Sequence, residues 1–151
     1  MHRHGYKGRK LGREKDQRRA LMKGLADSLI FNESIETTFP KAKELVPYME
    51  KLITKAKNPS LANRRLVIAK LNTKEAVNKL FDELAPKLSS RNSGHLKLKR
   101  TTLRRGDNAQ LARVSFSDDL SKAPQKPKPA AAKPKTTKPA KTTAKAKKET
   151  K

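Results

Sequence analysis

The alternation of apolar and polar residues predicts a short strand followed directly by a long amphipathic helix in the first half of the chain. Ile35, Thr37 and Phe39 alternate with polar neighbours, which is the period of a strand with one covered face. Pro40 suits the first turn of a helix, where its missing N–H would have no partner within the helix. Beyond it, apolar residues recur at helical spacing and predict one buried stripe: Ala42, Leu45, Val46, Met49, Leu52, Ile53 and Ala56.

Two prolines limit the predicted helices. The ring of Pro47 would collide with the carbonyl of Lys43, so we expect a kink or a broken first turn at this point of the long helix. Pro86 is expected to end the last helix of the chain.

Apolar spacing predicts three further helices, and polar residues mark their starts. One begins at about Asp16, a candidate cap, and buries Leu21, Met22, Leu25, Ala26, Leu29 and Ile30. A short helix follows the cap Asn58 and the first-turn Pro59, and its apolar stripe is Leu61, Ala62, Leu66, Ile68 and Ala69. Asn72 with Glu75 three residues later resembles a capping box for a helix that buries Val77, Leu80, Phe81 and Leu84.

The last apolar segments alternate with a period of two and predict an antiparallel hairpin. A loop over 87–94 leads into strands over 95–102 and 111–116, and turn-forming residues fill 104–108. A lone hairpin is marginally stable, so we expect it to join the strand over 35–39 and to pack its apolar side on the helices. The predicted fold class is α+β, with a small mixed sheet of about three strands packed on three to four helices.

Charge divides the chain into three parts. The 151 residues include 38 Lys and Arg against 14 Asp and Glu, a net charge of +24. Residues 1–23 carry nine basic and two acidic residues, and residues 24–120 carry eighteen basic and eleven acidic residues. Residues 121–151 carry eleven basic residues and one acidic residue. Only the middle part has the large apolar residues that a core needs. We therefore predict an extended basic arm over 1–13, a globular α/β domain over 14–120, and a disordered Lys/Pro/Ala tail over the last part.

Several classes of function lack a sequence signal. The chain has no cysteine, no apolar run long enough to cross a bilayer and no secretory signal, which favours a cytoplasmic protein. His2 and His4 lie in the arm and His95 begins a strand, and no carboxylate cluster accompanies them. We therefore predict no catalytic residue, no metal site, no cofactor and no enzyme activity. Arg105-Gly106-Asp107 matches a cell-adhesion tripeptide and is better explained as the hairpin turn.

Basic residues gather in the arm, in the loop that begins at Lys87, on the outer strand positions and in the hairpin turn, a distribution typical of nucleic-acid binding. In the arm, cations neutralise phosphates and Tyr6 can stack on an exposed base. Arg18 and Arg19 oppose the dipole of the first helix, which suggests either an external anion or a solvated face. The candidate RNA-binding residues are Arg3, His4, Tyr6, Lys7, Arg9, Lys10, Arg13, Arg18, Arg19, Lys41, Lys43, Arg64, Arg65, Arg91, Lys97, Lys99, Arg100, Arg104 and Arg105.

Three stretches closely resemble, in order, signatures of the seventeenth large-subunit ribosomal protein family of bacteria: MHRHGYKGRKLGR at 1–13, IETTFPKAKEL at 35–45 and RRGDNA at 104–109. The likeness covers roughly Met1 to Phe116. It implies a compact α/β domain whose arm is embedded in 23S ribosomal RNA near the exit of the peptide tunnel. It also implies a single copy beside neighbouring large-subunit proteins in the cytoplasm, with no membrane, no small-molecule substrate and no catalysis.

Two other functions are compatible with parts of the chain. The tail resembles the Lys/Pro/Ala tails of DNA-binding proteins, which makes a DNA-compacting nucleoid protein the main alternative. A small hydrolytic enzyme would have to use His2, His4, His95 or Asp107. For the tail itself, salt-sensitive RNA tethering and a flexible solubilising extension are equal hypotheses.

Overall fold

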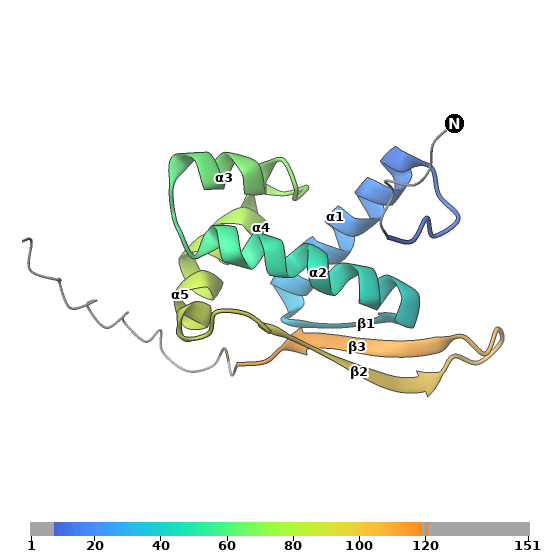
Figure 1. Cartoon of the computed structure of the whole chain (residues 1–151). Coiled ribbons are helices and arrows are strands. Elements are labelled where there is room, and N and C mark those ends of the chain that lie inside the picture. The colour runs from blue at the N-terminus through green and yellow to red at the C-terminus, as the bar shows by residue number, and fades with distance from the viewer. Residues whose placement is uncertain (1–7, 119, 121–151) are drawn as a thin grey trace, which may run out of the picture.

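The fold consists of one layer of helices on one side of a small sheet (Figure 1). The computed structural model describes residues 8–118 and 120. Its α-helices are α1 (Lys15–Asn32), α2 (Phe39–Ala56), α3 (Leu61–Ile68), α4 (Lys74–Lys79) and α5 (Ala85–Lys87). A π-helical turn, Leu80–Leu84, joins α4 to α5, and a 3₁₀ turn, Leu88–Ser90, follows α5. The strands are β1 (Ser34–Thr38), β2 (Leu96–Leu103) and β3 (Gln110–Phe116).

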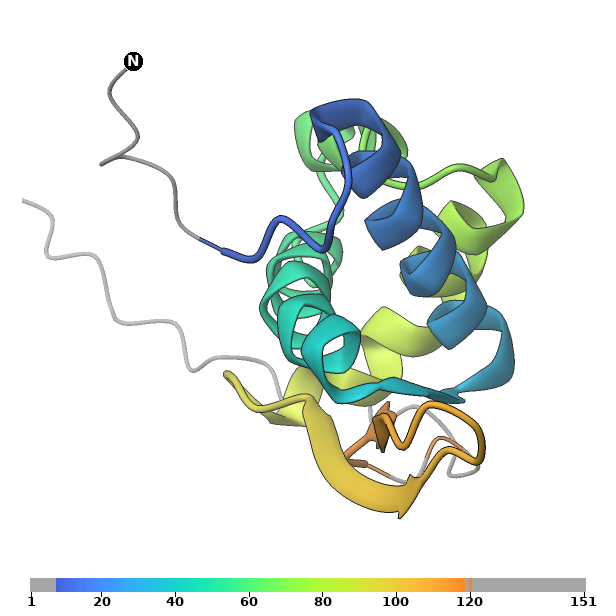
Figure 2. The same ribbon diagram turned by 90° about the vertical axis from the view of Figure 1, so that its right-hand side faces the viewer.

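The sheet has the order β1-β3-β2, and both pairs of strands are antiparallel. Val114 of β3 lies opposite Ile35 of β1 on one side and Leu98 of β2 on the other. The α+β class and the hairpin are confirmed. The sheet is fully antiparallel and not mixed as predicted, because β1 runs antiparallel to the central strand β3. Figures 1 and 2 both place the helices on one face of the sheet, and none of the described helices covers the other face.

The core lies between α1, α2 and the inner face of the sheet. Leu45, Met49 and Ile53 of α2 are fully buried, and Val114 of β3 meets the same cluster. The predicted stripe of α2 is confirmed, with Val46 half-buried at its edge. Each large side chain of this kind stabilises the fold by about 1.5–3 kcal/mol relative to leaving it exposed.

Two helices begin at side-chain caps that differ from the predicted ones. Ser60 accepts a hydrogen bond from the Asn63 N–H at 3.2 Å, and Thr73 accepts one from the Ala76 N–H at 3.3 Å. The helix α1 starts after Glu14, whose side chain makes no cap hydrogen bond. The structure therefore contradicts three predicted caps: Asp16, Asn58 and Asn72.

The short helix α3 turns its predicted buried stripe toward solvent. Leu61, Leu66 and Ile68 are 69%, 49% and 46% exposed, whereas Val67, which the prediction left out, is buried. The helix is held through the opposite side, where Val67 joins the core cluster.

Neither proline ends its helix. The helix α2 continues without a break through Pro47, so the predicted broken turn was wrong. Pro86 lies inside the short helix α5, and the chain stays helical as far as Ser90. The predicted loop over 87–94 is therefore confirmed only after Ser90. Pro86 is tolerated because it falls in the first turn of α5, where its missing N–H costs little.

The chain before α1 folds back where the structure describes it. The Arg13 N–H donates to the Lys10 carbonyl at 3.2 Å, and Leu11 and Gly12 adopt φ values of 56° and 62°. These residues form a tight turn rather than an extended arm. Figure 2 shows the segment from Gly8 onward passing beside α2 before it joins α1. Residues 1–7 of the predicted arm and the predicted tail over 121–151 lie outside the described residues.

Candidate nucleic-acid interface

A basic groove of about 410 Å³ opens between the residues before α1, the first half of α1, the middle of α2 and the end of α3. Its charged side chains come from all of these segments, and they are Arg9, Arg18, Arg19, Lys23, Lys70 and Glu44. Apolar surface is contributed by Leu11, Met22, Ala69 and the ring of Tyr48. The groove therefore combines a strongly positive wall with an apolar floor.

The floor of the basic groove is held by a hydrogen bond between helices. The Tyr48 hydroxyl donates to the Lys70 carbonyl at 2.5 Å, which ties α2 to the residues after α3. Burial raises the pKa of Tyr48, with a smaller contribution from the nearby carboxylate of Asp27, so the phenol stays protonated and able to donate. Two groove residues, Lys23 and Lys70, were missed from the sequence. Helical spacing from Arg19 could have indicated the first, but only the tertiary fold brings the second to the groove.

The uncovered face of the sheet is a second basic surface. Lys99 of β2 lies directly opposite Arg113 of β3, and Arg113 lies opposite Glu36 of β1. The Arg113 guanidinium is 3.7 Å from the Glu36 carboxylate, and Lys97, two residues before Lys99 in β2, is exposed on the same face. Like charges directly opposite on neighbouring strands destabilise a sheet, and an external anion would relieve that repulsion. We call Lys97, Lys99 and Arg113 the outer sheet face.

The hairpin tip is ordered by a carboxylate. Arg104 donates from Nε and from a terminal nitrogen to Asp107 at 3.0 and 2.5 Å, and the Ala109 N–H donates to the same carboxylate at 3.2 Å. The hydrogen bonds from Arg104 and from the Ala109 backbone lower the pKa of Asp107 to about 2. The turn predicted over 104–108 is confirmed. Arg104 is thus engaged within the loop, and the neighbouring Arg105 is exposed at the tip.

Two predicted RNA-binding arginines contact aromatic rings of their own chain. The Arg100 guanidinium lies 4.6 Å from the centre of the Phe39 ring, and Arg64 lies 5.3 Å from the centre of the Phe81 ring. Arg64 also donates to the side chain of Asn78 at 2.7 Å. Both contacts join separate elements of the fold, which gives these cations a structural role.

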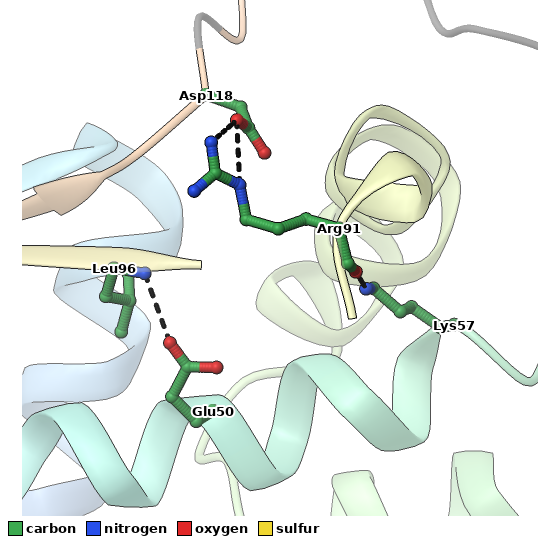
Figure 3. A network of polar contacts seen from close by, with 5 residues as sticks. All are labelled: Glu50, Lys57, Arg91, Leu96 and Asp118. Carbon is green, nitrogen blue, oxygen red and sulfur yellow. Dashed lines mark hydrogen bonds and ion pairs between the residues drawn. The ribbon is translucent and has the colours of Figure 1, made fainter. Parts of the chain in front are cut away.

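A third arginine belongs to a polar network at the end of α2 (Figure 3). Arg91 donates twice to Asp118 at 2.8 and 3.1 Å, and its carbonyl accepts a hydrogen bond from Lys57. Seven residues earlier in α2, which is about two turns, the Glu50 carboxylate accepts the Leu96 N–H at 3.1 Å at the start of β2. The network fastens both ends of the β2–β3 hairpin to α2.

His95 lies beside this network and is fully buried. Its Nε2 atom is 3.9 Å from the Glu50 carboxylate, and among the described residues neither ring nitrogen has a hydrogen-bond partner of normal geometry. Burial lowers the pKa of His95 and Lys57 lowers it further, while Glu50, Asp118 and the backbone of Asn92 oppose the shift. The folded chain therefore favours the neutral imidazole.

We expect the free energy of unfolding to fall as the pH drops below about 6.5. An unfolded His titrates near 6.5 and folded His95 titrates lower, so between those values the unfolded chain binds more protons. The stabilisation is complete above the unfolded pKa and is lost as the pH falls toward the folded one. Urea midpoints at pH 7.5 and 5.5 measure the difference. In His95→Leu the difference should shrink, and in His4→Gln it should not. Equal pH dependence in His95→Leu and the parent chain would contradict the assignment.

The remaining predicted residues divide between the surface and the part of the chain outside the description. Arg3, His4, Tyr6 and Lys7 precede the described residues. The structure places four of the others at the surface: Lys10, Arg13, Lys43 and Arg65. Lys41 is half-buried. Sequence reasoning did not select Arg113, although its place in the period-two pattern of β3 already put it on the side opposite the core.

Two further features of the described residues bear on function. No group of three or more His, Cys, Asp or Glu side chains among residues 8–118 and 120 is arranged to hold a metal ion. Across the same part of the chain, no helix has both the length and the apolar character needed to cross a membrane.

Comparisons with known proteins agree on one family. A family model described as ribosomal protein L17 matches residues 21–117. Large ribosomal subunit protein bL17 of Wolinella succinogenes is 54% identical over 115 residues, covering 76% of this chain and 97% of the relative. The proteins of the same name from Campylobacter concisus and Aliarcobacter butzleri are 50% and 48% identical over 115 residues, covering 76% of this chain and 96% and 97% of those relatives. The chain belongs to the ribosomal protein L17 family of the large ribosomal subunit.

Proposed function

We propose that this chain is a structural component of the large ribosomal subunit that binds 23S ribosomal RNA near the exit of the peptide tunnel. In this proposal it is present as one copy among neighbouring large-subunit proteins in the cytoplasm, and it catalyses no reaction. The observation that carries the RNA assignment is the outer sheet face, where Lys99 lies directly opposite Arg113 on a face that no described helix covers, with Glu36 beside Arg113 on the next strand. Membership of the L17 family supports the ribosomal location.

Two basic surfaces on different sides of the domain support the role of a bracket between RNA segments. In Figures 1 and 2 the uncovered face of the sheet points away from α3 and from the start of α1, where the basic groove lies. Because RNA phosphates bind cations without regard to base sequence, such surfaces give affinity, and the rigid spacing between them gives selectivity for RNA shape. The core would hold the two surfaces at that spacing.

The direct test is the protein content of salt-washed large subunits. We expect about one copy of the chain in each subunit, and cosedimentation with the large-subunit peak in a sucrose gradient. A DNA-compacting protein would instead follow the nucleoid. Recovery of the chain mainly away from ribosomes in growing cells would contradict the proposal.

Two single substitutions that each remove one positive charge should behave differently. Lys99→Gln removes a cation of the outer sheet face, so the slope of log K against log salt for 23S RNA should fall by about 1 in magnitude, with stability changed by less than about 0.5 kcal/mol. Arg64→Gln removes the contacts to Asn78 and Phe81, so it should lower stability by about 1 kcal/mol and keep the salt slope. Filter binding between 50 and 200 mM salt and urea unfolding measure the two quantities. Equal salt slopes for both variants would contradict the assignment of the outer sheet face.

A further inference from the structure

The basic groove has the shape and chemistry of a site for a single nucleotide. We propose that it receives one unstacked nucleotide of the bound RNA, with the base on the apolar floor at Met22 and Tyr48 and the phosphate at the surrounding cations. This inference rests on the proposed RNA binding and adds to it a defined structural element of the RNA, an extruded base.

The size of the groove favours a single nucleotide over a duplex. Its volume of about 410 Å³ lies within the range of about 300–1,000 Å³ that is usual for small-molecule sites. A paired helix keeps its bases stacked inside and presents phosphates and sugars outside, so its bases would not reach the floor at Met22. An unpaired base at a bulge or loop can leave the stack and enter.

The charges around the opening favour a phosphate. Five cations and one carboxylate, Glu44, line the groove, so its lining carries net positive charge even though Arg9 and Arg18 also interact within the chain. The ion pair that links Arg19 to Asp16 across 3.6 Å is largely exposed and contributes little. Gathering cations at one opening is unfavourable in the free protein, and the phosphate of a nucleotide would offset that repulsion.

The walls of the groove are built before any ligand binds. Gly8 has a φ of 108°, a backbone conformation that residues other than glycine rarely adopt, and in this conformation the chain lies beside the Glu44 carboxylate of α2. On the other side, the hydrogen bond from Tyr48 to the Lys70 carbonyl fixes the aromatic ring. A preformed aromatic and apolar surface is what base stacking requires, and stacking of this kind accepts any base.

The three methionines of the chain provide a direct probe. With ¹³C-methyl methionine in the full-length protein, Met22 reports the floor of the groove, and fully buried Met49 of the core serves as the internal control. The probes are an RNA duplex with a single-nucleotide bulge and the same duplex fully paired. We expect the bulged RNA to shift the Met22 signal and not the Met49 signal, and to bind at least about tenfold more tightly, the factor that one stacked base supplies.

A matched pair of variants, one in α3 and one at the residue that follows it, tests the site without changing charge. Ala69→Leu fills the groove, whereas Ala62→Leu adds the same side chain at an exposed position outside it. The tenfold preference for the bulged RNA should disappear in Ala69→Leu and remain in Ala62→Leu. The proposal would be overturned if Ala62→Leu lost more of this preference than Ala69→Leu, or if both variants lost it equally.

Further outcomes separate this inference from the proposed function. Binding of both RNAs with an unmoved Met22 signal would overturn the nucleotide site and leave RNA binding standing, whereas binding of neither RNA would overturn the proposed function. Adenosine 5′-monophosphate should shift Met22 only weakly, and inorganic phosphate should not shift it. If adenosine 5′-monophosphate bound more tightly than the bulged RNA, the groove would be a free-nucleotide site and the RNA assignment would fall.

Discussion

Replacing Leu45 with alanine is expected to lower the free energy of unfolding by about 3 kcal/mol. Leu45 is fully buried in α2 among core residues from α1 and the sheet. Removing its side chain loses the transfer free energy of the buried methyl groups and leaves a cavity, and changes of this kind cost about 2–5 kcal/mol. Urea denaturation of the full chain, followed by circular dichroism, measures the difference at constant m-value.

Leu61→Ala is the matched control for that substitution. Both positions are leucines at helical spacing, yet Leu61 is 69% exposed, so its replacement should change stability by less than about 0.5 kcal/mol. If Leu61→Ala destabilised the domain as much as Leu45→Ala, the outward orientation of α3 would be wrong and the face predicted from the sequence would be right.

The contrast between these leucines shows where periodicity is sufficient to predict burial. The helix α2 is long, its polar side carries several lysines, and its apolar stripe repeats for several turns, so the buried face was predicted correctly. The helix α3 is short and has apolar residues on both sides, so periodicity could not choose between Leu66 and Val67. Packing of α3 against α2 and α4 made that choice, and a pattern within one segment contains no information about it.

Helix starts were misplaced by one or two residues for a related reason. Asn58 and Ser60 can both cap a helix, as can Asn72 and Thr73. What selects the cap is an extended backbone that aims the side-chain oxygen at an N–H three residues later, and Ser60 has that backbone with a ψ of 153°. The type of side chain therefore identified the region in which each helix begins, and the backbone dihedral angles determined which residue in that region is the cap.

The sequence predicted which elements carry the basic residues of the candidate interface, but not which residues lie next to one another in the fold. A period of two placed Lys97 and Lys99 on one side of their strand, but the pairing of Lys99 with Arg113 depends on the register between strands. The sequence also did not reveal that Arg64, Arg91 and Arg100 are engaged by side chains distant in the chain. Counting cations therefore overestimates the number available to a polyanion, because part of the positive charge holds the fold together.

Removing residues 2–13 is expected to abolish stable incorporation into the large subunit while the domain still folds. Among the described residues the buried core begins at Met22, so the deletion takes no described residue from it, and the thermal unfolding midpoint should change little. The deletion does remove one cation of the basic groove, Arg9, together with the nearby cations Lys10 and Arg13 and with Gly8, which lines the groove beside Glu44. Loss of these phosphate contacts should weaken RNA binding most at low salt and should lower the magnitude of the slope of log K against log salt. The measurement is cosedimentation of the truncated chain with large subunits in a sucrose gradient.

Deletion of residues 121–151 is the control, because it removes more positive charge than the N-terminal deletion from the other end of the chain. If affinity depended on net charge alone, this control would lose at least as much binding as the N-terminal truncation. If the placement of charge decides, the control should still incorporate, with at most a defect at low salt that disappears at high salt, where tethering by the tail is already screened. Equal cosedimentation of the N-terminal truncation and the full chain would show that the arm and the groove wall it provides do not anchor this protein to RNA.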